Sequence, residues 1–133
     1  MAAFLSHAPP PPVVLIVEDD ALLRMLAADV VEDAGHIALQ ACDADEALAI
    51  LRARIDVAMV FTDINMPGSM NGLELAHAVS VGWPPIKIVI ASGRVRLLAS
   101  DMPPDCGFLG KPYLMSDLTA HLRSLIGRGA ACS

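Results

Sequence analysis

The sequence predicts an α/β protein with a doubly wound, five-stranded parallel sheet whose two faces are covered by helices. Short apolar runs alternate with longer stretches of helical periodicity, and this strand–helix pattern occurs five times. Right-handed crossovers between parallel strands place such helices on both faces of one sheet. The 133 residues suffice for one domain, and 55% of them are hydrophobic but only 4% aromatic, so we expect an aliphatic core.

The first strand–helix unit begins with a continuous aliphatic run. Val13–Val17 is typical of a strand that is buried on both faces. Asp20 can cap the following helix, which should end near Ala34 because Gly35 comes next. The residues at helical spacing that we expect to face the core are Leu22, Leu23, Leu26 and Val30.

The second unit and the third strand follow closely. Ile37–Ala41 is expected to form a short second strand. Asp43 and Glu46 have the spacing of a capping box, and the helix that they begin should end near Arg54. Val57–Phe61 then has the composition of a third buried strand.

Turn residues separate the next elements. Asp63–Gly72 is expected to be a loop, and Leu73–Val81 a third helix that Gly82 stops. Trp83–Pro85 breaks the helical pattern, because proline cannot continue a helix. Ile86–Ala91 is then the fourth strand.

The last two units are less regular. Arg94–Asp101 should form only a short or irregular fourth helix, because the prolines at 103 and 104 close it. Phe108–Gly110 is a brief fifth strand, and Tyr113–Ile126 is expected to be the final helix.

The folded domain should occupy residues 13–127. Prolines at 9–12 cannot enter a helix, so we expect a disordered leader at 1–12 and a flexible tail at 128–133. A formal net charge of −6 and the lack of a basic face argue against direct binding of nucleic acid. No apolar run has the length of a membrane span, and three dispersed cysteines indicate reduced thiols in the cytoplasm.

Polar residues follow four of the predicted strands. Glu18 and Asp19 follow the first strand, Asp63 the third, Ser92 the fourth and Lys111 the fifth. Because the carboxyl ends of parallel strands meet at one edge of a sheet, we expect these side chains to lie together. Each of them alone could be an ordinary cap or turn residue. Together, three carboxylates, a hydroxyl and an amine form a site for a divalent cation and a phosphoryl group.

This order of residues resembles the receiver domain of response regulators in two-component systems, of the stand-alone or hybrid-kinase type. The most specific stretches are Asp63–Pro67 and Asn71–Leu75, and the resemblance covers roughly residues 13–127. It implies a flavodoxin-like sheet with the strand order 2-1-3-4-5.

The resemblance also implies a magnesium site and a phosphoacceptor. Its Mg²⁺ ligands would be Glu18, Asp19, Asp63 and the backbone carbonyl of Asn65, and Asp63 would carry the aspartyl phosphate. Glu18 stands where the family more often has aspartate. Asn65 and Arg94 match positions that tune the lifetime of the phosphate.

Three further residues have roles in the family. Lys111 would contact the phosphoryl oxygens, and Ser92 would donate its hydroxyl to one of them. Phe108 matches the aromatic residue that turns inward as the serine moves, so Ser92 and Phe108 would form the switch. The peptide bond before Pro112 is expected to be cis.

The function implied is a phosphorylation-dependent signalling switch. The phosphoryl group would come from a histidine kinase or a histidine phosphotransfer protein of a phosphorelay, and its arrival would change the binding of an output protein. The resemblance also allows a homodimer through the face of the fourth helix, fifth strand and fifth helix. We expect no DNA-binding output domain after Ile126, and no metabolic reaction beyond self-phosphorylation and autodephosphorylation.

Two alternatives stay open at this point. One is a Mg²⁺-dependent phosphatase or phosphotransferase acting on small molecules, although Glu18-Asp19-Asp20 lacks the Asp-x-Asp spacing of dehalogenase-like enzymes. The other is a degenerate receiver that binds partners without phosphorylation. The presence of Asp63, Ser92 and Lys111 argues against that second alternative.

Overall fold

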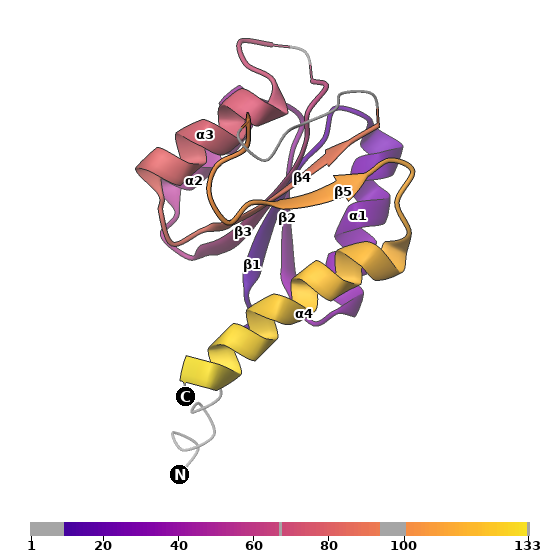
Figure 1. The fold of residues 1–133 in the computed structure, drawn as a ribbon, viewed down its shortest axis with the longest axis vertical. Coiled ribbons are helices and arrows are strands. Elements are labelled where there is room, and N and C mark those ends of the chain that lie inside the picture. Colours follow the sequence, from indigo (N-terminus) through magenta and orange to yellow (C-terminus); the bar gives the residue numbers. More distant parts are fainter. Residues whose placement is uncertain (1–9, 67, 94–100, 133) are drawn as a thin grey trace.

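The computed structural model of the protein describes residues 10–66, 68–93 and 101–132. It contains one parallel sheet with the order β2-β1-β3-β4-β5, which confirms the predicted topology (Figure 1). The strands are β1 (Val13–Val17), β2 (Ile37–Ala41), β3 (Val57–Asp63), β4 (Lys87–Ser92) and β5 (Gly107–Gly110). The helices within these residues are α1 (Ala21–Asp33), α2 (Ala44–Ala53), α3 (Gly72–Gly82) and α4 (Met115–Cys132).

The sheet separates two apolar layers. Helices α1 and α4 lie on one face, and α2 and α3 cover the other (Figure 1). Successive residues of β1 point to opposite faces, so Val13 and Leu15 join the α2/α3 layer while Val14 and Ile16 join the α1/α4 layer. This double burial explains why β1 is aliphatic without interruption.

The predicted core face of α1 is wrong. Leu22, Leu23 and Leu26 are exposed by 65%, 44% and 42%, and the side chains that contact the sheet include Ala27 and Val31. The spacing of 27 and 31 is also helical, and a small alanine lets the helix lie close to the strands. The large residues of the predicted stripe therefore point toward solvent, except Val30, which is half-buried.

The helices begin at polar caps. The Asp20 carboxylate accepts the Leu23 amide, so Asp20 caps α1 as predicted. Asp43 caps α2, but Glu46 reaches back to the amide of Cys42 rather than to that of the cap. The complete capping box lies instead at the start of α3. There the side chain of Asn71 accepts from the amide of Glu74, and the side chain of Glu74 accepts from the amide of Asn71.

The final helix is longer than predicted, and two other predicted segments lie mostly outside the described residues. The final helix does not end near Ile126, because α4 continues to Cys132 and includes most of the predicted flexible tail. A glycine inside a helix costs only about 0.5–1 kcal/mol, so Gly127 and Gly129 do not suffice to stop it. The irregular fourth helix predicted over Arg94–Asp101 and most of the predicted leader lie outside the described residues.

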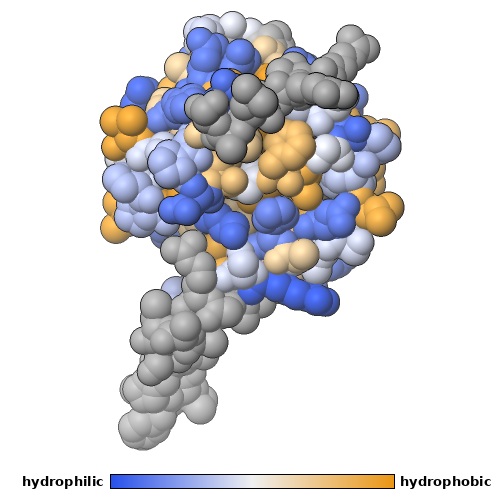
Figure 2. Space-filling view, in the orientation of Figure 1, coloured by the Kyte–Doolittle hydropathy of each residue, from blue (hydrophilic) through white to orange (hydrophobic). Residues whose placement is uncertain are grey.

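The surface mixes hydrophilic and hydrophobic side chains. Figure 2 shows hydrophobic residues among hydrophilic ones on the face in view. The exposed apolar residues include Leu22 and Met25 of α1 and Val81 of α3, with exposed fractions of 65%, 57% and 83%. None of the helices in the described part of the chain has both the length and the apolar character needed to cross a membrane.

The burial of two leucines predicts unequal effects of the same truncation. Leu122 of α4 is fully buried, so Leu122→Ala should lower the free energy of unfolding by about 2–5 kcal/mol. Leu22→Ala removes the same atoms from an exposed site and should change it by less than about 0.5 kcal/mol. Urea unfolding of both variants checks this, and similar losses would contradict the orientation of α1.

Candidate functional site

The predicted polar residues gather at one edge of the sheet. Asp63 is the last residue of β3 and Ser92 the last of β4, while Glu18 follows β1 and Lys111 follows β5. Parallel pairing brings these strand ends to the same edge. Glu18, Asp63 and Ser92 are all buried, with exposed fractions of 8%, 8% and 3%.

Three carboxylates form a compact cluster at this edge. Glu18, Asp19 and Asp63 each offer an oxygen, and these oxygens lie within 4.8 Å of one another. Oδ1 of Asp63 is buried and has no hydrogen-bond partner among the described residues. An unpartnered buried acceptor and several carboxylate oxygens are the donor set that a hard cation such as Mg²⁺ prefers, so these residues fit the ion.

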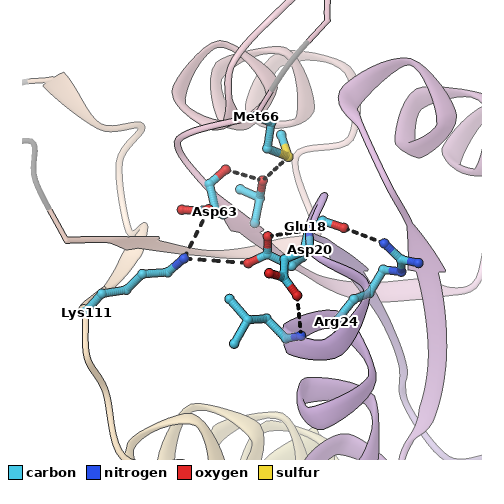
Figure 3. A network of polar contacts seen from close by, with 8 residues as sticks. Glu18, Asp20, Arg24, Asp63, Met66 and Lys111 are labelled. Carbon is cyan, nitrogen blue, oxygen red and sulfur yellow. Dashed lines mark hydrogen bonds and ion pairs between the residues drawn. The ribbon is translucent and has the colours of Figure 1, made fainter.

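Lys111 supplies the positive charge opposite the carboxylates. Its Nζ lies 3.0 Å from Oδ2 of Asp63 and 3.6 Å from Oε1 of Glu18 (Figure 3). Burial alone would lower the pKa of Lys111, but the hydrogen bond and charge of Asp63, helped by Glu18, raise that pKa above its ordinary value. The lysine therefore keeps its charge across the physiological pH range.

The Glu18 carboxylate contacts the Asp20 amide and Lys111, but its ionised form is disfavoured by burial and by the charge of Asp63. Its Oε2 accepts the amide of Asp20 at 3.0 Å. Burial raises the pKa of Glu18, and the charge of Asp63 raises it further, while the Asp20 amide and Lys111 oppose the shift. The two carboxylate oxygens of Glu18 thus face different partners, Oε1 toward Lys111 and Oε2 toward the Asp20 amide.

The backbone of Asp63 is fixed by the start of α3. The Gly72 amide donates to the Ile64 carbonyl at 2.9 Å, and the Ile64 amide donates to the Ala91 carbonyl at 3.1 Å. A Cβ atom on Gly72 would lie 1.9 Å from the Asp63 carbonyl oxygen, so only glycine permits this approach. Gly72 was predicted as a turn residue and as part of the Asn71–Leu75 stretch, but its contact with Asp63 was not foreseen from the sequence.

The ends of β4 and β5 are also joined. The amide of Lys111 donates to the carbonyl of Ser92 at 2.9 Å, and the Lys111–Pro112 peptide bond is cis. A Cβ on Gly93 would lie 3.0 Å from Cβ of Lys111, so this glycine allows the lysine to pass close to the end of β4. Ser92 and Lys111 are thereby brought next to each other.

Of the remaining predicted site residues, Asn65 and Phe108 are exposed, and Arg94 lies outside the described residues. Asn65 is exposed and lies two residues after Asp63, the last residue of β3. Phe108 lies on β5 and is 39% exposed, so its ring faces outward. Arg94 is not among the residues that the structure describes.

Two features near the site were not foreseen from the sequence. A groove of about 450 Å³ runs from the site between α1 and the start of α4, lined among others by Leu23, Leu26, Tyr113 and Met115. Arg24 of α1 donates to the carbonyl of Glu18 (Figure 3). Leu23 and Leu26 are exposed and line this groove, an orientation of α1 that neither periodicity nor composition indicated.

The fold and the site together define a class of protein. A doubly wound sheet in the order 2-1-3-4-5, with an acidic cluster and a lysine at its carboxyl edge, is the arrangement of a receiver domain. The family model described as the response regulator receiver domain matches residues 14–123. The chain therefore belongs to the receiver domain family of two-component response regulators. Receiver domains bind Mg²⁺ at their acidic pocket and interact with histidine kinases or phosphotransfer proteins.

Individual relatives agree with this assignment. The chain is 40% identical over 70 residues to the nitrogen assimilation regulatory protein NtrX of Azorhizobium caulinodans, a match that covers 52% of the chain but only 15% of that protein. A response regulator receiver protein from Sinorhizobium medicae is similar in structure, with a TM-score of 0.81 and 25% identity over 88% of this chain and 95% of that one. A sensor protein from Polaromonas gives a TM-score of 0.76 and 26% identity, and the match covers 90% of this chain and 98% of that one.

The raised pKa of Glu18 predicts a stability difference that depends on pH. Without Mg²⁺, the ionised carboxylate destabilises the fold once the pH rises above its ordinary value of 4.5, because the folded state holds the proton more tightly than the unfolded state. Glu18→Gln should therefore be more stable than the wild type at neutral pH in EDTA, and this gain should shrink as the pH falls to 4.5 and below.

Urea unfolding at neutral pH and at pH 4.5 measures how much more stable Glu18→Gln is than the wild type. Excess Mg²⁺ should reduce this difference at neutral pH. Asp29→Asn, which removes one exposed carboxylate charge on α1, is the matched control for the change in net charge. An equal stability difference at both pH values would contradict the proposed cost of ionising Glu18.

Proposed function

We propose that this chain is a phosphorylation-dependent switch whose phosphoacceptor is Asp63. The observation that carries this proposal is the state of that carboxylate. One oxygen, Oδ1, is buried and has no hydrogen-bond partner within the described part of the chain, and the other lies 3.0 Å from Nζ of Lys111. A carboxylate with one free oxygen and a neighbouring cation is arranged to receive a phosphoryl group.

Each residue has a defined part in the transfer. An oxygen of Asp63 forms the bond to phosphorus while the bond from phosphorus to the donor histidine breaks, and the bonding electrons return to the imidazole nitrogen. Glu18, Asp19, Asp63 and the carbonyl of Asn65 would hold Mg²⁺, which supplies neutralisation of the negative charge gathered at the phosphoryl oxygens. Lys111 adds a point charge to the same oxygens.

The switch follows from the new charge on Asp63. Ser92 is buried at the end of β4 and would donate its hydroxyl to a phosphoryl oxygen. Phe108, now facing outward on β5, would turn inward as Ser92 moves. The surface formed by β5 and α4 would then change its affinity for an output protein or for a second copy. Asn65 and Arg94 would set how long the phosphate lasts.

The phosphodonor is proposed to dock on the exposed face of α1. Leu22, Met25 and Leu26 are exposed by 65%, 57% and 42%, and Leu26 lines the groove that leads to Lys111. Apolar side chains gathered beside a polar site are typical of a protein-binding surface. A helical kinase or phosphotransfer domain lying on α1 would bring its phosphohistidine to Asp63, in the cytoplasm where such donors act.

Phosphorylation by a small phosphodonor tests the central proposal. Acetyl phosphate with Mg²⁺ should add one phosphoryl group to the protein, measured by intact mass, and the gain should vanish with EDTA or in Asp63→Asn. Asp56→Asn is the matched control, because Asp56 is an exposed carboxylate paired with Arg54 before β3. It should be phosphorylated like the wild type.

Two outcomes would overturn the proposal. A folded wild-type protein that binds Mg²⁺ and a beryllofluoride phosphate analogue, yet gains no mass, would favour a partner-binding receiver that is not phosphorylated. Repeated turnover of an aryl phosphate monoester would favour the alternative of a small-molecule phosphatase.

The docking face makes a separate prediction. The double variant Leu22→Gln, Met25→Gln should slow phosphoryl transfer from a phosphorylated histidine phosphotransfer protein by about tenfold or more, equal to about 1.4 kcal/mol of binding free energy. Phosphorylation by acetyl phosphate should not change. Val81→Gln, an exposed site on α3, is the control. Equal slowing with both donors would place the effect inside the site rather than at a docking face.

A further inference from the structure

Arg24 joins three elements beside the acidic cluster. Its Nη1 donates to the backbone carbonyl of Glu18 at 2.8 Å, and its Nε donates to the side-chain oxygen of Gln40 at 3.1 Å. Arg24 belongs to α1, Gln40 belongs to β2, and Glu18 follows β1. Figure 3 shows the guanidinium reaching back from the helix to the end of that strand.

The carbonyl that Arg24 holds belongs to the peptide between the two consecutive carboxylate residues of the cluster. The amide of Glu18 donates to the carbonyl of Ala41 at 3.0 Å, so the backbone of Glu18 is fixed on both sides. The plane of the peptide from Glu18 to Asp19 sets the directions in which both side chains leave the backbone. Arg24 therefore acts on the geometry of the cluster without touching its carboxylates.

The choice of arginine matters for the charge balance. Both hydrogen bonds of its guanidinium among the described residues go to neutral oxygens, so Arg24 does not compete with a cation for the carboxylates of Glu18 and Asp19. Guanidinium is always charged and presents its donors in a rigid fork, which fits two acceptors on different elements. A lysine has no such fork.

We propose that Arg24 is a positioning residue, which orients Glu18 and Asp19 for Mg²⁺ through the peptide between them. This inference rests on the proposed function, since it assigns Arg24 to the metal site of the phosphorylation switch. Gln40 contributes by accepting a hydrogen bond from Nε of Arg24, which holds the guanidinium in place. Groups behind metal ligands typically change metal affinity when removed, because the ligands lose their fixed orientation.

Calorimetric titration with Mg²⁺ tests the assignment in the intact chain. Arg24→Met should weaken Mg²⁺ binding by roughly tenfold, the lower end of the range for groups behind metal ligands. Arg24→Lys should recover part of the loss, because lysine can reach one acceptor but not both. Gln40→Ala, the mildest change, should weaken binding less than Arg24→Met does.

Arg54→Met is the matched control for the loss of one guanidinium. Arg54 forms an exposed ion pair with Asp56 before β3, away from the carboxyl edge of the sheet. Its replacement should leave the Mg²⁺ dissociation constant unchanged. The initial rate of phosphorylation provides a second readout, and the deficit of Arg24→Met should be largest at low Mg²⁺ and recover at saturating Mg²⁺.

Three results would overturn the inference. Tighter Mg²⁺ binding by Arg24→Met, with Arg24→Lys equal to the wild type, would show that only its charge matters. A lower melting temperature with unchanged Mg²⁺ affinity in all the Arg24 and Gln40 variants would show a purely structural contact. A wild type that binds no Mg²⁺ would remove the basis for the assignment. A wild type that binds Mg²⁺ but is not phosphorylated would contradict the proposed function alone, and the comparison of affinities would still decide the role of Arg24.

Discussion

The ion pair between Lys111 and Asp63 is the interaction on which the site depends. Three carboxylates whose oxygens lie within 4.8 Å of one another repel, and burial strengthens that repulsion. The ammonium group at 3.0 Å offsets part of it and makes the buried Asp63 tolerable before any cation binds. Because β4 lies between β3 and β5, this pair crosses the end of β4 and ties the edge strand β5 to β3 at the centre of the sheet.

Several backbone contacts hold the strand ends around this ion pair. Gly72 lets the start of α3 press against the carbonyl of Asp63, and the capping box of Asn71 and Glu74 holds that helix end in place. In the proposed function, a charge added to Asp63 would act mainly through Lys111 and Ser92. Its effect would then leave the site along β4 and β5, since the two residues are joined by a backbone hydrogen bond.

The strands and the main site residues were predictable because burial and strand order leave clear signals. Continuous aliphatic runs marked the strands, and Asp63 could be placed because strand ends share an edge. The orientation of α1 was not predictable, because Leu22 and Ala27 each belong to a stripe with helical spacing, and hydrophobicity favoured the larger residue. Gly72 and Arg24 were missed because each acts on a backbone carbonyl several residues earlier in the chain, and neither composition nor periodicity records such contacts.

The exposed leucines of α1 have a consequence for the free protein in solution. Leu22, Leu23 and Leu26 leave an apolar strip in water, and such a strip attracts any other apolar surface, including that of a second copy. The formal net charge of −6 works against this attraction by long-range repulsion between copies, and added salt screens that repulsion. Self-association would use the same face of α1 that is proposed to receive the phosphodonor. Ionic strength and protein concentration therefore influence what fraction of the protein has this face available to its partner.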